Sequence, residues 1–186
     1  MTRQDAFAIL SEFARSDSLI KHALAVEAAL RHHAVLQGED PELWGMVGLL
    51  HDFDYERWPE PPDHTRKGAE ILRARGVDAE IVDAVLSHAA WNVEACPRDR
   101  PLRKTLYAVD ELCGFLLAVA YVRPEGLEGL EPRSVVKKMK QKAFAAAVNR
   151  DDIRKGAELL GLSLEELIVR TVEGLRKVAG ALGVQR

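Results

Sequence analysis

The sequence has few of the residues and patterns that mark secreted or membrane-spanning proteins. Its 186 residues include only two cysteines, Cys96 and Cys113, which form no CxxC pair and are too few for a disulfide framework. A reducing compartment, the cytoplasm, is therefore expected. Residues 115–122 form the most apolar stretch but are too few for a membrane span, and the charged first residues do not resemble a secretion signal. No contact with a membrane is expected.

A strong excess of charge of one sign is also missing. The formal net charge is −3, although 30% of the residues are charged. This balance gives the chain as a whole no attraction to nucleic acid, which is therefore not an expected partner. One run of lysines allows three interpretations, namely the rim of a substrate site, a nucleic-acid contact or, as for most such runs, a solvated surface: Lys137, Lys138, Lys140 and Lys142.

Sustained alternation of apolar and polar residues, the pattern of a half-buried strand, is not present either. Apolar residues recur at helical spacing almost throughout, which predicts an all-α fold. Helices are expected at residues 4–15, 18–36, 41–51, 63–75, 79–88, 102–121, 151–160 and 163–182. The predicted N-caps are Asp17, Asp40, Asp78 and Ser163, and Ser163 with Glu166 fits a capping box.

A chain of this length can bury one sizeable core and contains no internal repeat, so a single domain covering residues 1–186 is predicted. We expect a helical bundle with a core at about 18–122 and a helical extension at about 133–186, joined by an intradomain loop. The helix at 102–121 is apolar on most faces. This pattern places it at the centre of the bundle and makes Asp110 a buried acid that needs a partner.

Side chains with metal-binding chemistry are distributed over separate predicted helices or their ends. The adjacent pair His51 and Asp52 offers an imidazole nitrogen and a carboxylate oxygen, although such a pair alone is weak evidence. Each candidate lies next to an apolar run, and a helical bundle can bring such groups to one point. A hydrogen-bonded core histidine competes with this interpretation at His22 and His88, and a structural salt bridge competes at Asp110. The candidate ligands are His22, His51, Asp52, His64, His88 and Asp110.

This order of residues resembles the HD-domain superfamily of metal-dependent phosphohydrolases. The segment GLLHDFDYERWPEPPDHTRKGAEIL also resembles the HDIG-type subgroup of predicted hydrolases, as do LYAVDELCGFLLA and SVVKKMKQKAFAAAVNRDDI. The resemblance covers nearly the whole chain from residue 20 onward and implies an HD-type helical fold. It further implies a minimal metal site of His22, His51, Asp52 and Asp110. Members with two metals have two more histidines, at the places of His64 and His88 here.

Six ligands are too many for one tetrahedral ion and suit two ions that share a carboxylate, so Asp52 is predicted to be the bridging ligand. One or two divalent ions are the expected cofactor, and Fe, Mn, Zn, Ni and Mg are all candidates. The expected reaction is hydrolysis of a phosphomonoester or phosphodiester of a small molecule, with nucleotides among the candidates, by metal-bound water. The alternative is a catalytically silent metal-binding module with a regulatory or partner-binding role.

Phosphate recognition requires cations close to the metal ligands. Arg66 and Lys67 follow the fourth predicted ligand and are predicted catalytic residues together with Asp52. Arg103 and Lys104 lie on the predicted helix that contains the final aspartate and are further candidates for a phosphate contact.

Three further expectations concern neighbouring residues. Gly68 has no side chain and so leaves space for another element or a ligand to approach. His32 and His33 are expected to be exposed. Three tryptophans either line a nucleobase pocket or, the stronger expectation, pack in the core: Trp44, Trp58 and Trp91.

Overall fold

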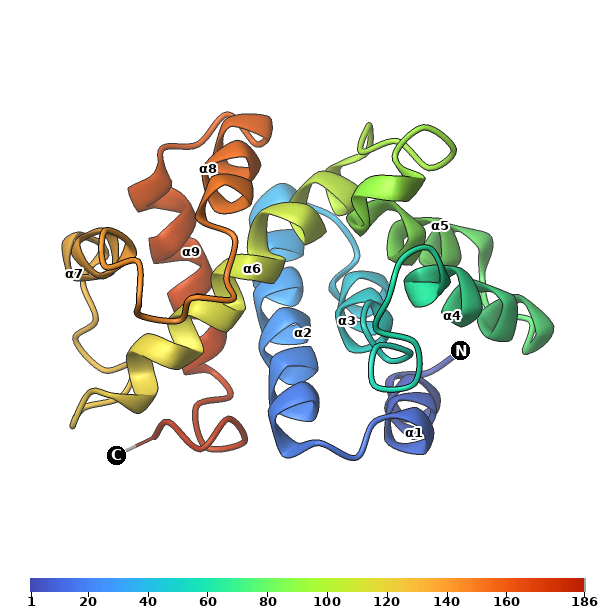
Figure 1. Cartoon of the computed structure of the whole chain (residues 1–186), viewed down its shortest axis with the longest axis horizontal. Helices are drawn as coiled ribbons and strands as arrows, with labels where there is room; N and C mark the ends of the chain where they lie inside the picture. Colours follow the sequence, from blue (N-terminus) through green and yellow to red (C-terminus); the bar gives the residue numbers. More distant parts are fainter. Residues whose placement is uncertain (186) are drawn as a thin grey trace.

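The computed structural model describes residues 1–185, and over this range it is all-helical, which confirms the predicted fold class (Figure 1). Within these residues, nine α-helices and one short 3-10 helix follow one another along the chain. They are α1 (Arg3–Phe13), α2 (Asp17–Gln37), α3 (Pro41–Leu50), α4 (Asp63–Ala74), α5 (Ala79–His88), η1 (Ala90–Asn92), α6 (Pro101–Tyr121), α7 (Pro132–Met139), α8 (Arg150–Leu159) and α9 (Leu164–Arg176).

The helix starts follow largely from capping residues in the sequence. Ser16, not Asp17 as predicted, caps α2, because the Ser16 hydroxyl accepts the Leu19 N–H and Asp17 is already helical. The capping box of α9 is confirmed. Three predicted N-caps are confirmed because their side chains accept a backbone N–H of the first turn: Asp40, Asp78 and Ser163.

The C-terminal part differs from the prediction at two places. Helix α7 was not predicted, because its eight residues bury only Val135 and Met139 and are too few to establish a helical period. The last helix ends at Arg176 and not at residue 182, because residues 177–183 form turns and Gly183 has a φ of +70°.

Helices α2 and α6 form the centre of the bundle. In Figure 1, α2 runs through the middle with α1, α3, α4 and α5 on one side and α7, α8 and α9 on the other, while α6 crosses it. Glycine allows the closest approaches: a Cβ on Gly48 would lie 2.6 Å from the Glu27 backbone of α2, and one on Gly156 would lie 2.5 Å from the Ala108 Cα of α6. Thus α3 is held against α2, and α8 against α6, at backbone contact.

His33 is buried, so the expectation that it would be exposed is wrong. Its side chain lies between α2 and α9, where Nε2 is 3.4 Å from the Thr171 hydroxyl and Nδ1 has no partner among residues 1–185. Burial lowers the pKa of His33 to about 4. The reason for the difference is tertiary, because the helix that covers His33 lies more than a hundred residues later in the chain.

We expect His33 to make the fold less stable as the pH falls from about 6.5 to 4. In this window the unfolded chain binds a proton on His33 and the folded chain does not, so acid favours unfolding. Between pH 7.5 and pH 5 the free energy of unfolding should fall by roughly 2 kcal/mol more in the wild type than in His33→Leu. Urea denaturation of both proteins at the two pH values measures this difference, and an equal fall in both would contradict it.

Among the described residues, no helix combines the length and the hydrophobicity that a membrane span requires.

Candidate metal centre

The six predicted ligands come together at one place between the central helices and α3, α4 and α5. His22 Nε2 of α2 lies 3.0 Å from Asp110 Oδ1 of α6, and 3.1 Å from His51 Nε2 at the end of α3. Asp52 follows in the next turn, while His64 and His88 lie at the start of α4 and the end of α5. Residues from five segments spread over almost ninety positions thus face one another, as a bundle permits.

The ligand atoms form two groups that share Asp52. In one group, donor atoms of His22, His51, Asp52 and Asp110 all lie within 4.8 Å of one another, and in the other the same holds for Asp52, His64 and His88. Metal bonds of about 2 Å require such separations between ligands of one ion. The residues present therefore fit divalent ions.

The carboxylate of Asp52 divides its two oxygens between these groups. Oδ2 lies 3.5 Å from His51 Nε2, whereas Oδ1 lies 3.3 Å from His64 Nε2 and 3.2 Å from His88 Nε2. A carboxylate placed in this way can bind one cation through each oxygen, which is the arrangement of a bridging ligand.

Hydrogen bonds fix the orientation of three imidazoles. His51 Nδ1 lies 2.8 Å from the Gly48 carbonyl, His88 Nδ1 lies 2.7 Å from the Val85 carbonyl, and His64 Nδ1 lies 3.0 Å from an Asp54 carboxylate oxygen. These oxygens accept, so each Nδ1 donates, and the neutral ring keeps its Nε2 lone pair for a metal ion. All three Nε2 atoms face Asp52.

Asp54 supports the predicted ligand His64, a role that was not predicted from the sequence. It is completely buried, and its carboxylate accepts hydrogen bonds from His64 Nδ1 and from the backbone N–H groups of Thr65 and Gly68. A Cβ on Gly68 would lie 2.8 Å from Asp54 Oδ2. The missing side chain of Gly68 therefore allows the Asp54 carboxylate to approach. The sequence feature that could have indicated Asp54 is an acid two residues after Asp52. In the structure the intervening residue, Phe53, is fully buried.

The charges of the centre compensate one another strongly. Burial alone would lower the pKa of His51, but the carboxylates of Asp52 and Asp110 outweigh it and raise the pKa to about 9. Burial likewise opposes charge on His64, and Asp52 with Asp54 raises that pKa to about 9. Conversely, burial would raise the pKa of Asp110, but the facing histidines hold it well below its usual range. The carboxylates of this cluster therefore favour positive charge beside them. Divalent ions that bind here would displace protons from the imidazoles.

The centre lies at the floor of a cavity of about 640 Å³. Five of the six ligands line it, while His51 lies beneath the surface and is fully buried. The remaining lining is mixed, with three aromatic rings, two cations and two acids: Tyr55, Trp91, Tyr107, Arg98, Lys155, Glu111 and Asp152. A volume of this size suits a small organic molecule.

A family model described as HD domain matches residues 19–120. The chain belongs to the HD domain family. HD domains are generally metal-dependent phosphohydrolases, and all six converging side chains lie within the matched residues of this HD domain. A search of curated proteins and a search of solved structures found no match.

The cations predicted to bind phosphate in this HD domain do not line the cavity. Arg66 is exposed and donates to the Asn92 side chain, and Lys67 pairs with Glu70, so their catalytic roles stay predictions. For Arg103 the expectation is wrong, because its buried guanidinium is paired with acids of α5, at 3.2 and 3.3 Å. Lys104 does not line the cavity either. The cations that do line it are Arg98 and Lys155.

The other residues singled out in the sequence have separate locations. Trp44 is buried in the core and Trp58 packs against Phe13, while Trp91 lines the cavity beside His64. Of the lysine run, two members line a different hollow, of about 530 Å³, together with two arginines of α8: Lys140, Lys142, Arg150 and Arg154.

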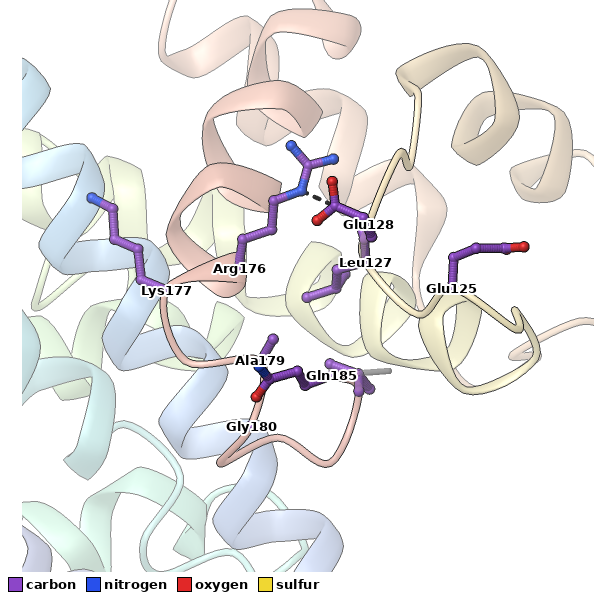
Figure 2. Close-up of a pocket in the computed structure, with 9 residues that line it drawn as sticks. Glu125, Leu127, Glu128, Arg176, Lys177, Ala179, Gly180 and Gln185 are labelled. Atoms are coloured by element: carbon purple, nitrogen blue, oxygen red, sulfur yellow. Dashed lines mark hydrogen bonds between the residues drawn. The ribbon is translucent and has the colours of Figure 1, made fainter.

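Figure 2 shows another hollow, of about 280 Å³, between residues 125–128 and the C-terminal turns. There Arg176 Nε donates to the Leu127 carbonyl across 3.1 Å and holds the end of α9 against the loop. None of the six predicted ligands lines this hollow, so it is separate from the metal centre of the HD domain.

Proposed function

We propose that the protein is a metal-dependent phosphohydrolase that cleaves a phosphomonoester or phosphodiester of a small molecule, with nucleotides as one candidate class. The observation that carries this proposal is the position of Asp52, whose two oxygens face two groups of ligands at the floor of an open cavity. One or two divalent ions, of Fe, Mn, Zn, Ni or Mg, are the cofactor that these oxygen and nitrogen ligands suit.

The six predicted ligands form two groups, one for each ion. His22, His51 and Asp110 would hold one ion, His64 and His88 the other, and Asp52 both. When bound, divalent ions at these places would lower the pKa of a coordinated water and withdraw charge from phosphoryl oxygens.

The protein's own contribution is the orientation of the ligand side chains and the lining of the cavity. The backbone carbonyls behind His51 and His88, and Asp54 behind His64, keep each Nε2 directed at Asp52 without rearrangement. The cavity wall above them provides cations and aromatic faces for the substrate. Such a fixed arrangement favours the transition state because its reorganisation cost is met during folding.

Two finer inferences accompany this proposal. The segment around His51 supports membership of the HDIG-type subgroup, since the residues of that segment supply four of the converging groups: His51, Asp52, Asp54 and His64.

Cys96 and Cys113 are both free and buried, which supports a reducing compartment such as the cytoplasm.

The proposal is tested by metal analysis and an activity screen of the purified protein. We expect bound divalent metal, and turnover of p-nitrophenyl phosphate or bis(p-nitrophenyl) phosphate that requires added Mn or Ni and stops with a chelator. A metal-replete protein that hydrolyses neither these esters nor any of a panel of nucleotides would favour the alternative, a catalytically silent metal-binding module.

A further inference from the structure

The wall of the cavity contains a rigidly held arginine, which lies against the end of α5 beside the predicted ligand His88. Arg98 Nε donates to the Ser87 carbonyl across 2.8 Å and Nη2 to the His88 carbonyl across 2.6 Å. The guanidinium also stacks on the Tyr107 ring, 3.6 Å from its centroid. Its third nitrogen, Nη1, takes part in neither of these two bonds, and Arg98 lines the cavity. A charged donor is thus fixed directly against the backbone carbonyl of His88, one of the predicted metal ligands.

The second part of this wall comes from α8. The Tyr107 hydroxyl donates to Asp152 Oδ1 across 2.9 Å, and Lys155 Nζ lies 3.8 Å from the same oxygen. Helix α8 reaches this position because Gly156 packs directly on Ala108. These two α8 residues lie beyond residue 120, where the match to the family model ends, so the C-terminal extension builds a part of the cavity that the family match does not cover.

The charges of this wall are balanced. Apart from the metal ligands, the cavity is lined by two cations, Arg98 and Lys155, and two acids, Glu111 and Asp152. A single phosphoryl group at the metals can use Arg98 as a partner. Additional anionic groups on the substrate would meet Glu111 and Asp152 without any excess of positive charge, and like charges repel. Hydroxyl or amine groups, by contrast, can donate hydrogen bonds to these carboxylates.

We propose that Arg98 binds a phosphoryl oxygen of the substrate through Nη1, and that Glu111 and Asp152 select a substrate with one phosphate and a neutral or basic polar remainder against polyanionic ones. This inference rests on the proposed function. Tyr107 is a positioning residue, since its ring supports the guanidinium and its hydroxyl holds Asp152.

The first experiment measures binding of inorganic phosphate to the Mn-loaded protein by isothermal titration calorimetry. Loss of one charge-assisted hydrogen bond should weaken binding about ten- to a hundredfold in Arg98→Gln and less in Arg98→Lys. Arg100→Gln is the matched control, because Arg100 is exposed, pairs with Glu80 and does not line the cavity. Unchanged phosphate affinity in Arg98→Gln would overturn the proposal. A parallel loss of Mn and of thermal stability would also overturn it, because Arg98 would then only support the end of α5.

The second experiment compares phenylphosphonate with 4-carboxyphenylphosphonate, which differ by one negative charge and cannot be hydrolysed. The wild type should bind the carboxylated compound about two- to fivefold more weakly, and Asp152→Asn should reduce this ratio while keeping an acceptor for Tyr107. An equal or tighter affinity for the carboxylated compound would overturn the selection by Glu111 and Asp152. Because neither experiment requires turnover, their failure is distinguishable from an absence of hydrolase activity.

Discussion

Replacement of Asp52 by alanine is expected to abolish turnover and to lower the metal content of the purified protein. Both ligand groups lose a member at once, because Asp52 is the only residue that the two groups share within the described chain. The rate should fall about a thousandfold or more, since metal ions contribute several kcal/mol of transition-state stabilisation and about 1.4 kcal/mol corresponds to a tenfold change. Elemental analysis and phosphatase kinetics measure the two effects.

Asp63→Ala is the matched control for this variant. Asp63 is also an aspartate near the metal centre in sequence, at the first position of α4, but it is exposed and belongs to neither ligand group. The control should retain metal and turnover. Circular dichroism must show that Asp52→Ala keeps its helix content, and full activity in a folded Asp52→Ala protein would refute the assignment of Asp52 as the bridging ligand.

The second large effect is expected at Asp54, which touches no metal position. Its carboxylate accepts from His64 Nδ1 and from two backbone N–H groups, those of Thr65 and Gly68. Asparagine has nearly the same shape, but its NH₂ group would face these donors and leave buried groups unpaired. Metal affinity at the group of His64 and His88 should therefore fall about ten- to a hundredfold in Asp54→Asn.

Dialysis against a graded series of chelator concentrations, followed by elemental analysis, measures this change. If two ions bind, Asp54→Asn should lose one of them at lower chelator concentration than the wild type and retain the other. Glu60→Gln provides a matched acid-to-amide change at an exposed position of the same loop. Equal retention of metal by all three proteins would contradict the role of Asp54 in orienting His64.

The sequence was sufficient to predict which six side chains converge, because two of their positions are costly for a polar group and the resemblance to the HD-domain superfamily supplied the rest of the set. Asp110 interrupts a helix that is apolar on most faces, and His51 with Asp52 ends another apolar helix, so their chemistry required an explanation. The helices themselves follow from apolar period and capping residues. Neither inference needed knowledge of which helices pack together.

The residues that were missed or misplaced depend on packing that the sequence does not display. Arg98 and Arg103 are only five residues apart in the sequence, yet α5 acids bind Arg103, whereas the carbonyls at the end of α5 hold Arg98 at the cavity. Asp152 and Lys155 reach the cavity only because α8 packs on α6 through Gly156. Contacts between residues so distant in the chain cannot be obtained from a helical period.

The distribution of the ligands over α2, α5, α6 and the turns flanking α3 and α4 has a further consequence. An ion held there would connect segments that are otherwise joined by packing and by a few side-chain contacts, and it would bind the folded chain but not the unfolded one. Mass action then makes the ion a cross-link whose strength depends on metal concentration. Metal supply would in this way govern the lifetime of the protein as well as its chemistry.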